Sequence, residues 1–328
     1  MPHSNCSVCR PPTTSFSQRP IGTVGALARM LQHPVDELER IAATADQRYR
    51  IGKRELKRDG TWRICYDALG VLKSIQARIQ CLILRKVGYP LYLQGSIKDP
   101  VSPRGQKANA GRHLRKRVLI SEDIKQFFPS VTSPVIFDIW HRFFRFPPPV
   151  AEILTKLTTK DGALPQGTKT SALLTNLVFW EHEWRVVADF HERGITYTRL
   201  IDDITCSTAR DLTTLEITRL IEALHAMVRR KGLRFNHKQD IARAGDRKVA
   251  TKLIVNAKTG LPVEKRSAIR AAVAQLRRRP QTARSTPAYA RDYYRISGQV
   301  AYLQQHHPNE GARHREVLTG LRPLVPHR

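Results

Sequence analysis

An adjacent pair of acids, Asp202 and Asp203, interrupts an apolar stretch in the second half of the chain. The surrounding residues 195–207, ITYTRLIDDITCS, have the pattern of two short strands joined at this pair. Strands joined by so short a turn form a hairpin and are antiparallel. Elsewhere, helical and strand patterns mix without regular alternation or an internal repeat. The sequence therefore predicts an α+β fold with an antiparallel sheet.

A third acid, Asp123, stands at the end of another apolar strand pattern, within RVLISEDIKQFFPSV at 117–131. Neighbouring carboxylates repel one another, and burial raises their pKa values. A divalent cation relieves both effects, and hard ions such as Mg²⁺ prefer oxygen ligands. Three acids on neighbouring strands would form a platform for two metal ions, which activate a hydroxyl and stabilise a leaving pyrophosphate. Acid pairs in turns are often merely solvated, so the pair by itself leaves both interpretations open.

A second motif, LPQGTKTSALLTN at 164–176, places a Pro-Gln-Gly loop before a helix rich in Thr and Ser. Gly167 would let a backbone or a base approach closely. Gln166 can donate and accept hydrogen bonds, and the helix N-terminus suits a phosphate. An ordinary helix cap with turn residues is the alternative interpretation of the same pattern.

The chain is strongly basic, with 56 Lys+Arg against 28 Asp+Glu in 328 residues and a formal net charge of +28. Such an excess implies a polyanionic partner, and nucleic acid is favoured over a membrane surface. We find no stretch approaching the roughly 20 apolar residues of a spanning helix and no signal-peptide pattern at the start. We expect a cytoplasmic protein that binds nucleic acid.

The cysteines divide into two groups. Cys65, Cys81 and Cys206 are scattered among apolar residues and are expected to be reduced core residues. Cys6 and Cys9 form a CxxC in a polar tail, where only His3 stands nearby. A structural zinc site needs four ligands, so a solvated tail is favoured over a zinc site.

Apolar spacing predicts the other elements. Expected helices lie around Leu27 to Leu31 and Leu38 to Ala42, at about 69–87, from Ser133 onward, and over 170–190, 212–231 and most of 265–328. The buried stripe expected at 69–87 is Leu72, Ile75, Ile79, Leu82 and Leu84. Expected strands lie in a basic hairpin at 49–66 turning at Asp59-Gly60, at 117–123 and 233–235, and in a hairpin formed by 249–256 and 261–264.

Four segments then follow one another along the chain: Asp123 to Ser130 (DIKQFFPS), Leu164 to Gly167 with Thr170, Ser171 and Asn176, Leu200 to Asp203 (LIDD), and Gly232 to Lys238 (GLRFNHK). In order and spacing they resemble the catalytic motifs of bacterial reverse transcriptases. The resemblance covers roughly residues 25–325. It implies a right-hand polymerase: a tail at 1–20, fingers at 21–120, a palm at 121–256 with inserted fingers helices around 134–170, and a thumb at 257–328.

Within that family the chain looks most like retron and related phage-defence enzymes. Asn109-Ala110-Gly111-Arg112-His113 matches their Asn-Ala-x-x-His motif, and 297–303 (SGQVAYL) resembles their thumb. Three departures stand out. Leu200-Ile201 replaces the usual Tyr-x before the acid pair, Lys169 and Ala172 replace prolines, and Ala250-Thr251-Lys252 replaces the Val-Thr-Gly triplet that helps recognise the cognate RNA.

The resemblance also implies residue roles. Asp123, Asp202 and Asp203 are the expected catalytic residues, and with Ile124 they form the expected site for two Mg²⁺ ions, with Mn²⁺ as an alternative. The expected nucleotide contacts are the steric gate Phe128, with Phe127 in the core, and Gln166, Gly167, Lys57, Arg58, Arg63 and Lys238. The expected RNA contacts are Asn109, Arg112 and His113.

The leading hypothesis is RNA-directed DNA synthesis from a partner non-coding RNA, in defence against phage. Its expected partners are the RNA template, the DNA product and deoxynucleoside triphosphates, with an effector protein and an oligomer left open. One alternative is a polymerase that makes repetitive or untemplated DNA, which the replacement at Leu200-Ile201 keeps open. Another is a non-catalytic RNA-binding scaffold, which the three intact acids disfavour.

Overall fold

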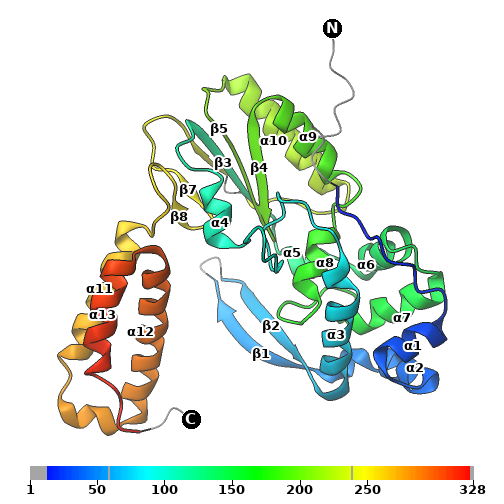
Figure 1. Ribbon diagram of the computed structural model, residues 1–328, viewed down its shortest axis with the longest axis horizontal. Helices are drawn as coiled ribbons and strands as arrows, with labels where there is room; N and C mark the ends of the chain where they lie inside the picture. The colour runs from blue at the N-terminus through cyan, green and yellow to red at the C-terminus, as the bar shows by residue number, and fades with distance from the viewer. Residues whose placement is uncertain (1–12, 58–59, 238, 326–328) are drawn as a thin grey trace. The chain divides into compact units, whose positions relative to one another are not determined.

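The computed structural model describes residues 13–57, 60–237 and 239–325 (Figure 1). These residues divide into two compact units. One contains the described residues up to Asn109 together with Arg117–Ala244, and the other contains Ala110–Lys116 and the described residues from Gly245 onward. The division at Ala244 falls twelve residues before the end expected for the palm, at residue 256. Residues 6 and 9 of the CxxC and Asp59 of the expected turn lie outside the described residues.

A four-stranded sheet forms the centre of the first unit. Its strands are β3 (Val118–Asp123), β4 (Ile195–Leu200), β5 (Asp203–Thr208) and β6 (Asp240–Ala242), in the order β4-β5-β3-β6. Every neighbouring pair is antiparallel, which confirms the α+β prediction. Strand β6 did not appear in the sequence pattern, because its three residues include two exposed ones.

Helices α9 (Glu183–Glu192) and α10 (Thr214–Arg229) lie along the sheet (Figure 1). The expected inward residues of α10, among them Leu220, Leu224 and Met227, are buried. A capping box starts this helix: the Thr213 side chain accepts from the backbone of Glu216, whose carboxylate accepts from the backbone of Thr213. Gly232, which the sequence predicted to stop this helix, lies just after its end at φ 70°, in the left-handed region that glycine adopts readily.

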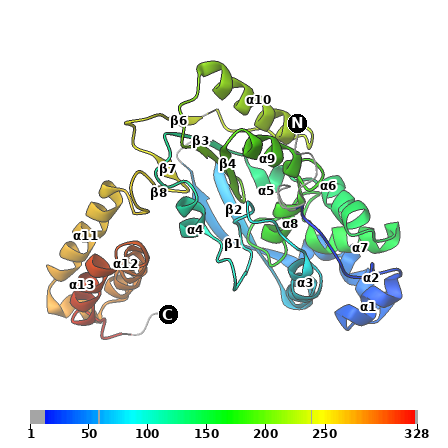
Figure 2. The ribbon, with the colours of Figure 1, turned by 45° about the horizontal axis from the view of Figure 1, so that its top comes forward.

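The predicted basic hairpin is present as β1 (Tyr49–Leu56) and β2 (Trp62–Ala68), which pair antiparallel. Beside it α3 (Gly70–Leu82) packs against α1 (Val24–Leu31) and α7 (Pro148–Thr158), and α2 (Val35–Ala43) packs against α1 and α7, as Figures 1 and 2 show. The helix expected at 69–87 is shorter, and Leu82 is exposed rather than buried. The chain leaves the helix at that point for a separate 3-10 turn, Leu84–Lys86.

Several short elements complete this unit. They are the 3-10 turn Ala45–Arg48, α4 (Gln106–Gly111), which crosses the boundary between the units, α5 (Phe127–Ser130), α6 (Ser133–Asp138), the π turn Ile139–Phe143 and α8 (Ser171–Leu177). The single helix expected over 170–190 was wrong, because the chain turns between α8 and α9. The turn lets Phe179 stack on Phe127 and lets buried Glu183 reach Arg199, so tertiary packing overrides helical propensity.

The second unit contains the hairpin of β7 (Val249–Ala250) and β8 (Leu253–Ile254), the 3-10 turn Gln281–Ser285, and three helices, α11 (Val263–Arg277), α12 (Pro287–His306) and α13 (Pro308–Thr319). The helices pack on one another (Figure 2). The strand expected at 261–264 was wrong, because Pro262 precedes the first turn of α11. The strand expected at 233–235 is reduced to one bridge, between Phe235 and Ile124. Within the described residues, no helix combines the length and apolarity needed to cross a membrane.

Candidate active site

The ends of three sheet strands bring the predicted acids together. Asp123, the last residue of β3, is paired in register with Asp203, the first residue of β5. Leu200 pairs with the same Asp203 from the other side, so Ile201 and Asp202 form the two-residue turn between β4 and β5. The backbone N–H of Ile124 donates to the carbonyl of Asp202 at 2.9 Å, which ties this turn to the strand of Asp123.

A cavity of about 400 Å³ opens beside these acids, within the first unit. Of the residues expected from the sequence, Lys57, Arg63, Asp123, Ile124, Phe128, Gln166 and Asp202 line it. Further lining residues include Trp62, Tyr66, Lys160, Asp161 and Asn236. Asp203 and Gly167 stand next to lining residues without lining the cavity themselves. Lys238 and Arg58 lie outside the described residues.

Asp123 has a perturbed carboxyl group. Its side chain meets solvent at the cavity, but the protein around it removes part of its water. This desolvation, together with the negative charge of Asp202, raises the pKa of Asp123 to about 6. The Asn236 amide, which donates to Oδ2 of Asp123 at 2.5 Å, opposes the shift, as do the positive charges of Lys57 and Arg63. Two cations, Lys57 and Arg63, and two carboxylates, Asp123 and Asp202, therefore surround the same cavity.

Asn236, part of the motif Gly232 to Lys238, contacts Asp123 directly. Its backbone N–H donates to the carbonyl of Asp123 at 2.8 Å, while its side chain holds the carboxylate of the same residue. The Arg234 carbonyl accepts from the N–H of Lys125 at 2.8 Å. The segment after α10 therefore runs against the end of β3. Its signal in the sequence was an asparagine next to a buried aromatic residue, Phe235.

The turn that carries Asp202 has an unusual backbone. Ile201 stands at φ 62°, in the left-handed region that β-branched residues rarely adopt. A two-residue hairpin turn with a positive φ at its first central position normally has glycine there. The left-handed conformation costs an L-residue about 1 to 2 kcal/mol. The surrounding structure must therefore stabilise this turn.

Two adjacent phenylalanines follow Asp123. Phe127 is buried and stacks on Phe179 with ring centroids 6.0 Å apart and an interplanar angle of 3°, which confirms its expected place in the core. Phe128 is half-buried and lines the cavity. Gln126 precedes the pair at φ 46°, so the chain turns sharply between Asp123 and the two rings. An aromatic wall beside the acids is the arrangement that a gate against the 2′-hydroxyl requires.

Gly167 serves a close approach between two backbones. It has φ 105°, and a Cβ there would lie 2.9 Å from the carbonyl oxygen of Tyr66. The Tyr66 N–H donates to the carbonyl of Gln166 at 2.7 Å, so the loop lies directly on strand β2. The loop thereby joins the basic hairpin to the cavity wall. Gln166 faces that cavity, whereas Gly167 allows the contact that holds Gln166 there.

The three residues expected to contact RNA differ in exposure. Arg112 is exposed, whereas the side chains of Asn109 and His113 are fully buried. Burial, with the positive charges of Lys116 and Arg112, lowers the pKa of His113 to about 3, so its imidazole is neutral. Of the three, Arg112 is the one that presents its side chain to solvent. An RNA contact by these residues stays a prediction.

The donor set at the cavity fits a divalent cation. Within the described residues, no three His, Cys, Asp or Glu side chains converge into a ready-made metal cluster. Two carboxylates nevertheless border the cavity, and the pKa of Asp123 is raised partly by Asp202. A cation between two such groups would remove their repulsion, and carboxylate oxygen is the donor that Mg²⁺ and Mn²⁺ accept.

Comparison with curated proteins finds several retron reverse transcriptases that are similar to this chain. No family model matches the chain. The chain is 31% identical over 316 residues to the retron Se72 reverse transcriptase of Salmonella heidelberg (strain 579083-10), which covers 94% of this chain and 82% of that protein. It is 29% identical over 242 residues to the retron Ec86 reverse transcriptase of Escherichia coli, with 73% of each chain covered. It is also 29% identical over 276 residues to the retron Mx65 reverse transcriptase of Myxococcus xanthus, covering 78% of this chain and 61% of that one.

Proposed function

Because the chain belongs to the retron reverse transcriptase family, and so is an RNA-directed DNA polymerase, we propose that it copies a partner non-coding RNA into DNA at the cavity beside Asp123 and Asp202. The observation that carries this proposal is the cavity itself. It combines two carboxylates with the cations Lys57 and Arg63 and with the ring of Phe128. Synthesis of DNA by nucleotidyl transfer uses all three: ligands for metal ions, donors for a triphosphate and a ring that selects deoxynucleotides.

We assign the metal ions to Asp123 and Asp202, with the main chain of Ile124 and the carboxylate of Asp203 supporting the site. When bound, two Mg²⁺ ions supply activation of the primer hydroxyl and charge neutralisation at the leaving pyrophosphate. Asn236 orients the Asp123 carboxylate through its 2.5 Å hydrogen bond. Mn²⁺ offers the same oxygen chemistry and serves as a probe for the site.

The remaining cavity residues would bind the incoming nucleotide. Lys57 and Arg63 would hold its triphosphate through charge-assisted hydrogen bonds. Gln166 would contact the nucleotide from the loop that Gly167 holds on β2. Phe128 would exclude a 2′-hydroxyl and so select deoxynucleotides. Lys238 is proposed, from its motif, to protonate the leaving pyrophosphate.

The right-hand description assigns the parts of the chain. Residues 21–120 would be the fingers, 121–256 the palm and 257–328 the thumb, with the helices of the second unit holding the template-product duplex through its backbone. A net charge of +28 supports this, because phosphate contacts dominate duplex binding and make it sensitive to salt. Arg112, which is exposed, is the strongest candidate for a contact to the non-coding RNA.

The biological setting that we propose is anti-phage defence, in which the RNA-templated DNA acts together with an effector protein. The test begins with protein purified together with its bound nucleic acid, to which Mg²⁺ and deoxynucleotides are added. Sequencing should give DNA complementary to the co-purified RNA. Homopolymer or short repeats would instead support untemplated synthesis. No product, with Asp202→Ala protecting cells from phage as well as wild type does, would support a non-catalytic scaffold.

A further inference from the structure

The acid-bearing turn is the part of the proposed active site that most needs support. Ile201 holds a left-handed conformation at φ 62°, and Asp202, the next residue, lines the cavity. A strained two-residue turn relaxes unless its surroundings fix it. The groups around the turn therefore decide where the Asp202 carboxylate points. The inference below rests on the proposed function, since it concerns the same site.

Arg199, on strand β4 just before the turn, is fully buried. Its Nε and Nη2 donate to the two carboxylate oxygens of Glu183, at 2.6 and 2.8 Å. Its other donors reach backbone carbonyls at 3.1 Å each: Nη1 bonds to Thr175 and Ile201, and Nη2 to Asn176. These bonds use all five N–H groups of a guanidinium. One of them ends on the carbonyl of the strained residue itself.

The backbone of Arg199 is held as firmly as its side chain. Its N–H donates to the carbonyl of Tyr92 at 2.8 Å, and its carbonyl accepts from the N–H of Gln94 at 2.8 Å. Leu93 forms a parallel bridge with the same residue. Residues 92–94 therefore act as a short extra edge beside β4, and they bring Gly95 next to the turn.

Gly95 provides the space for the Ile201 side chain. A Cβ at Gly95 would lie 2.4 Å from Cδ1 of Ile201 and 2.9 Å from its backbone nitrogen. The buried Asn176 amide donates to the Gly95 carbonyl at 2.8 Å. Asn176 in turn offers its own carbonyl to Arg199. One closed set of contacts thus links the turn, the pocket of the Ile201 side chain and the last turn of α8.

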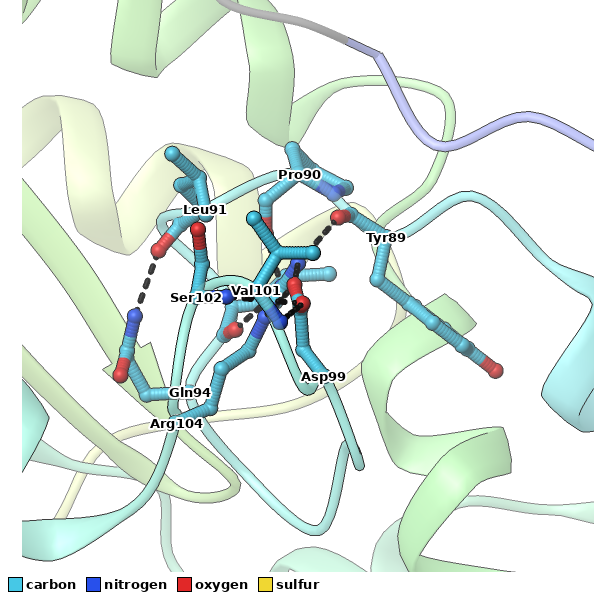
Figure 3. Close-up of polar contacts among 9 residues, drawn as sticks. Tyr89, Pro90, Leu91, Gln94, Asp99, Val101, Ser102 and Arg104 are labelled. Atoms are coloured by element: carbon cyan, nitrogen blue, oxygen red, sulfur yellow. Dashed lines mark hydrogen bonds and ion pairs between the residues drawn. The ribbon is translucent and has the colours of Figure 1, made fainter.

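A second arginine, Arg104, contacts the same segment, as Figure 3 shows. Nη1 of Arg104 donates to the carbonyls of Pro90 at 2.6 Å and Leu93 at 2.9 Å, and Nη2 donates to Tyr89 at 2.8 Å. Asp99 pairs with the same guanidinium at 3.0 Å. Arg104 therefore braces the segment that carries Gly95, and Arg199 connects this braced segment to the turn.

We propose that Arg199 is a positioning residue for catalysis: it holds the strained turn so that the Asp202 carboxylate is directed into the cavity before metal ions bind. A lysine could keep the charge beside Glu183, but it has three donors at one point and cannot reach two carboxylate oxygens and three carbonyls in a plane. The alternative role for Arg199 is a plain core ion pair that stabilises the fold without affecting the site. The two roles predict different measurements.

The test compares Arg199→Lys with wild type and with a matched control, Arg142→Lys. Arg142 pairs with Asp138 and Glu181 in the same unit, so its loss removes an arginine ion pair elsewhere. Mn²⁺ is the probe for metal binding, and its affinity is measured by electron paramagnetic resonance titration. The kcat and KM for deoxynucleotide incorporation are then measured on a primed RNA template. We expect Arg199→Lys to weaken Mn²⁺ binding and to lower kcat, each by about tenfold or more. KM for the nucleotide should change little, and Arg142→Lys should leave Mn²⁺ binding and kcat near wild type.

Wild-type Mn²⁺ binding and kcat in a folded Arg199→Lys protein would overturn the proposal, whatever its unfolding temperature. If Arg199→Lys does not fold, Gly95→Ala decides, because it displaces Ile201 while leaving the arginine intact. Loss of Mn²⁺ affinity in Gly95→Ala supports the proposal, and its retention overturns it. A wild type that binds Mn²⁺ but makes no DNA would refute the proposed function, while the Mn²⁺ comparison would still decide the role of Arg199.

A double-mutant cycle that combines Arg199→Lys with Ile201→Gly, measured by Mn²⁺ affinity, distinguishes a role through the turn from a purely structural role. Glycine adopts the positive φ of this turn without strain, so the turn should need the guanidinium less. We expect Arg199→Lys to cost at least threefold less Mn²⁺ affinity in the Ile201→Gly background than in wild type, a non-additive result. Equal losses in both backgrounds would overturn a role through the strained turn.

Discussion

The carboxyl group of Asp123 is the most informative single group in the cavity. Its pKa is raised to about 6, first by desolvation and then by Asp202. A metal ion binds the ionised form, so Mn²⁺ affinity should rise as the pH increases through 6 and fall below it. Electron paramagnetic resonance titrations between pH 5 and 8 would measure this. An affinity that stays flat between pH 5 and 7 would contradict the assignment of Asp123 as a ligand.

The same shift has a consequence for the stability of the metal-free protein. The pKa of Asp123 in the folded state lies above its ordinary value of 3.8, so its contribution to stability is present below pH 3.8 and is lost as the pH rises through 6. Asp123→Asn should therefore raise the unfolding temperature at pH 7.5 and change it little at pH 4. Asp211 is the control, because Arg117 lowers its pKa, and Asp211→Asn should lower stability at pH 7.5.

Phe128 should control which sugar the enzyme accepts. It lines the cavity half-buried, whereas Phe127 is stacked in the core. Phe128→Ala should raise ribonucleotide incorporation relative to deoxynucleotide incorporation by about tenfold or more, measured as a ratio of kcat/KM values. Phe127→Leu is the control: it should lower stability by about 1 to 3 kcal/mol and leave that ratio unchanged. An unchanged ratio in a folded Phe128→Ala protein would refute the gate.

At the scale of elements, the loop 164–167 depends on one glycine. Gly167→Ala should destabilise the protein by about 2 kcal/mol or more, because the new Cβ would meet the Tyr66 carbonyl and φ 105° is strained for alanine. Gly162 also has a positive φ, 76°, but open space around it. Gly162→Ala should therefore cost only about 1 kcal/mol. Urea unfolding measures both, and equal costs would show that the contact with β2 is unimportant.

In the hairpin of β7 and β8, a substitution to glycine should stabilise the protein. Thr251 and Lys252 form its two-residue turn, at φ 47° and 67°. Such turns favour Asn-Gly, and the retron triplet has glycine where this chain has Lys252. Lys252→Gly should stabilise the protein by about 0.5 to 1 kcal/mol, since relief of strain exceeds the entropy lost by glycine on folding. Thermal unfolding checks this, and a lower unfolding temperature would contradict it.

The sequence predicted some elements better than others for physical reasons. Hairpins β1–β2 and β4–β5 and helix α10 were predictable, because strand alternation, turn residues and a capping box are local signals. The break between α8 and α9 was not, since it depends on Phe179 reaching Phe127 and on Glu183 reaching Arg199. Both contacts join residues far apart in the sequence. The 3-residue strand β6 gave too short a pattern to detect.

Some residues of the candidate site could be predicted from the sequence, and others could not. Asp123, Asp202, Phe128 and Gln166 were predictable because motif order marks them, and all of them line the cavity. Arg199 was not, because an arginine in an apolar strand gives no sign of its partners. Glu183 lies 16 residues away and Gly95 more than 100, and folding alone brings them to the turn.

At the scale of the whole molecule, the charge and the cavity lead to one account. In the proposed account, a chain of net charge +28 would hold nucleic acid, and the acidic centre within its first unit would carry out the chemistry. Binding of a primed RNA template should weaken steeply as salt rises, because phosphate contacts release counterions. The acids should matter little for that binding, since their role is in catalysis.

Extension of a DNA primer on a defined RNA template, by wild type and by Asp202→Asn, tests the central claim most directly. The account predicts complementary DNA from wild type in Mg²⁺ and a rate at least about a thousandfold lower from Asp202→Asn, since metal-ion catalysis supplies several kcal/mol. Both proteins should bind the template equally and unfold at similar temperatures. Primer extension by a folded Asp202→Asn protein at a rate near that of wild type would contradict the account.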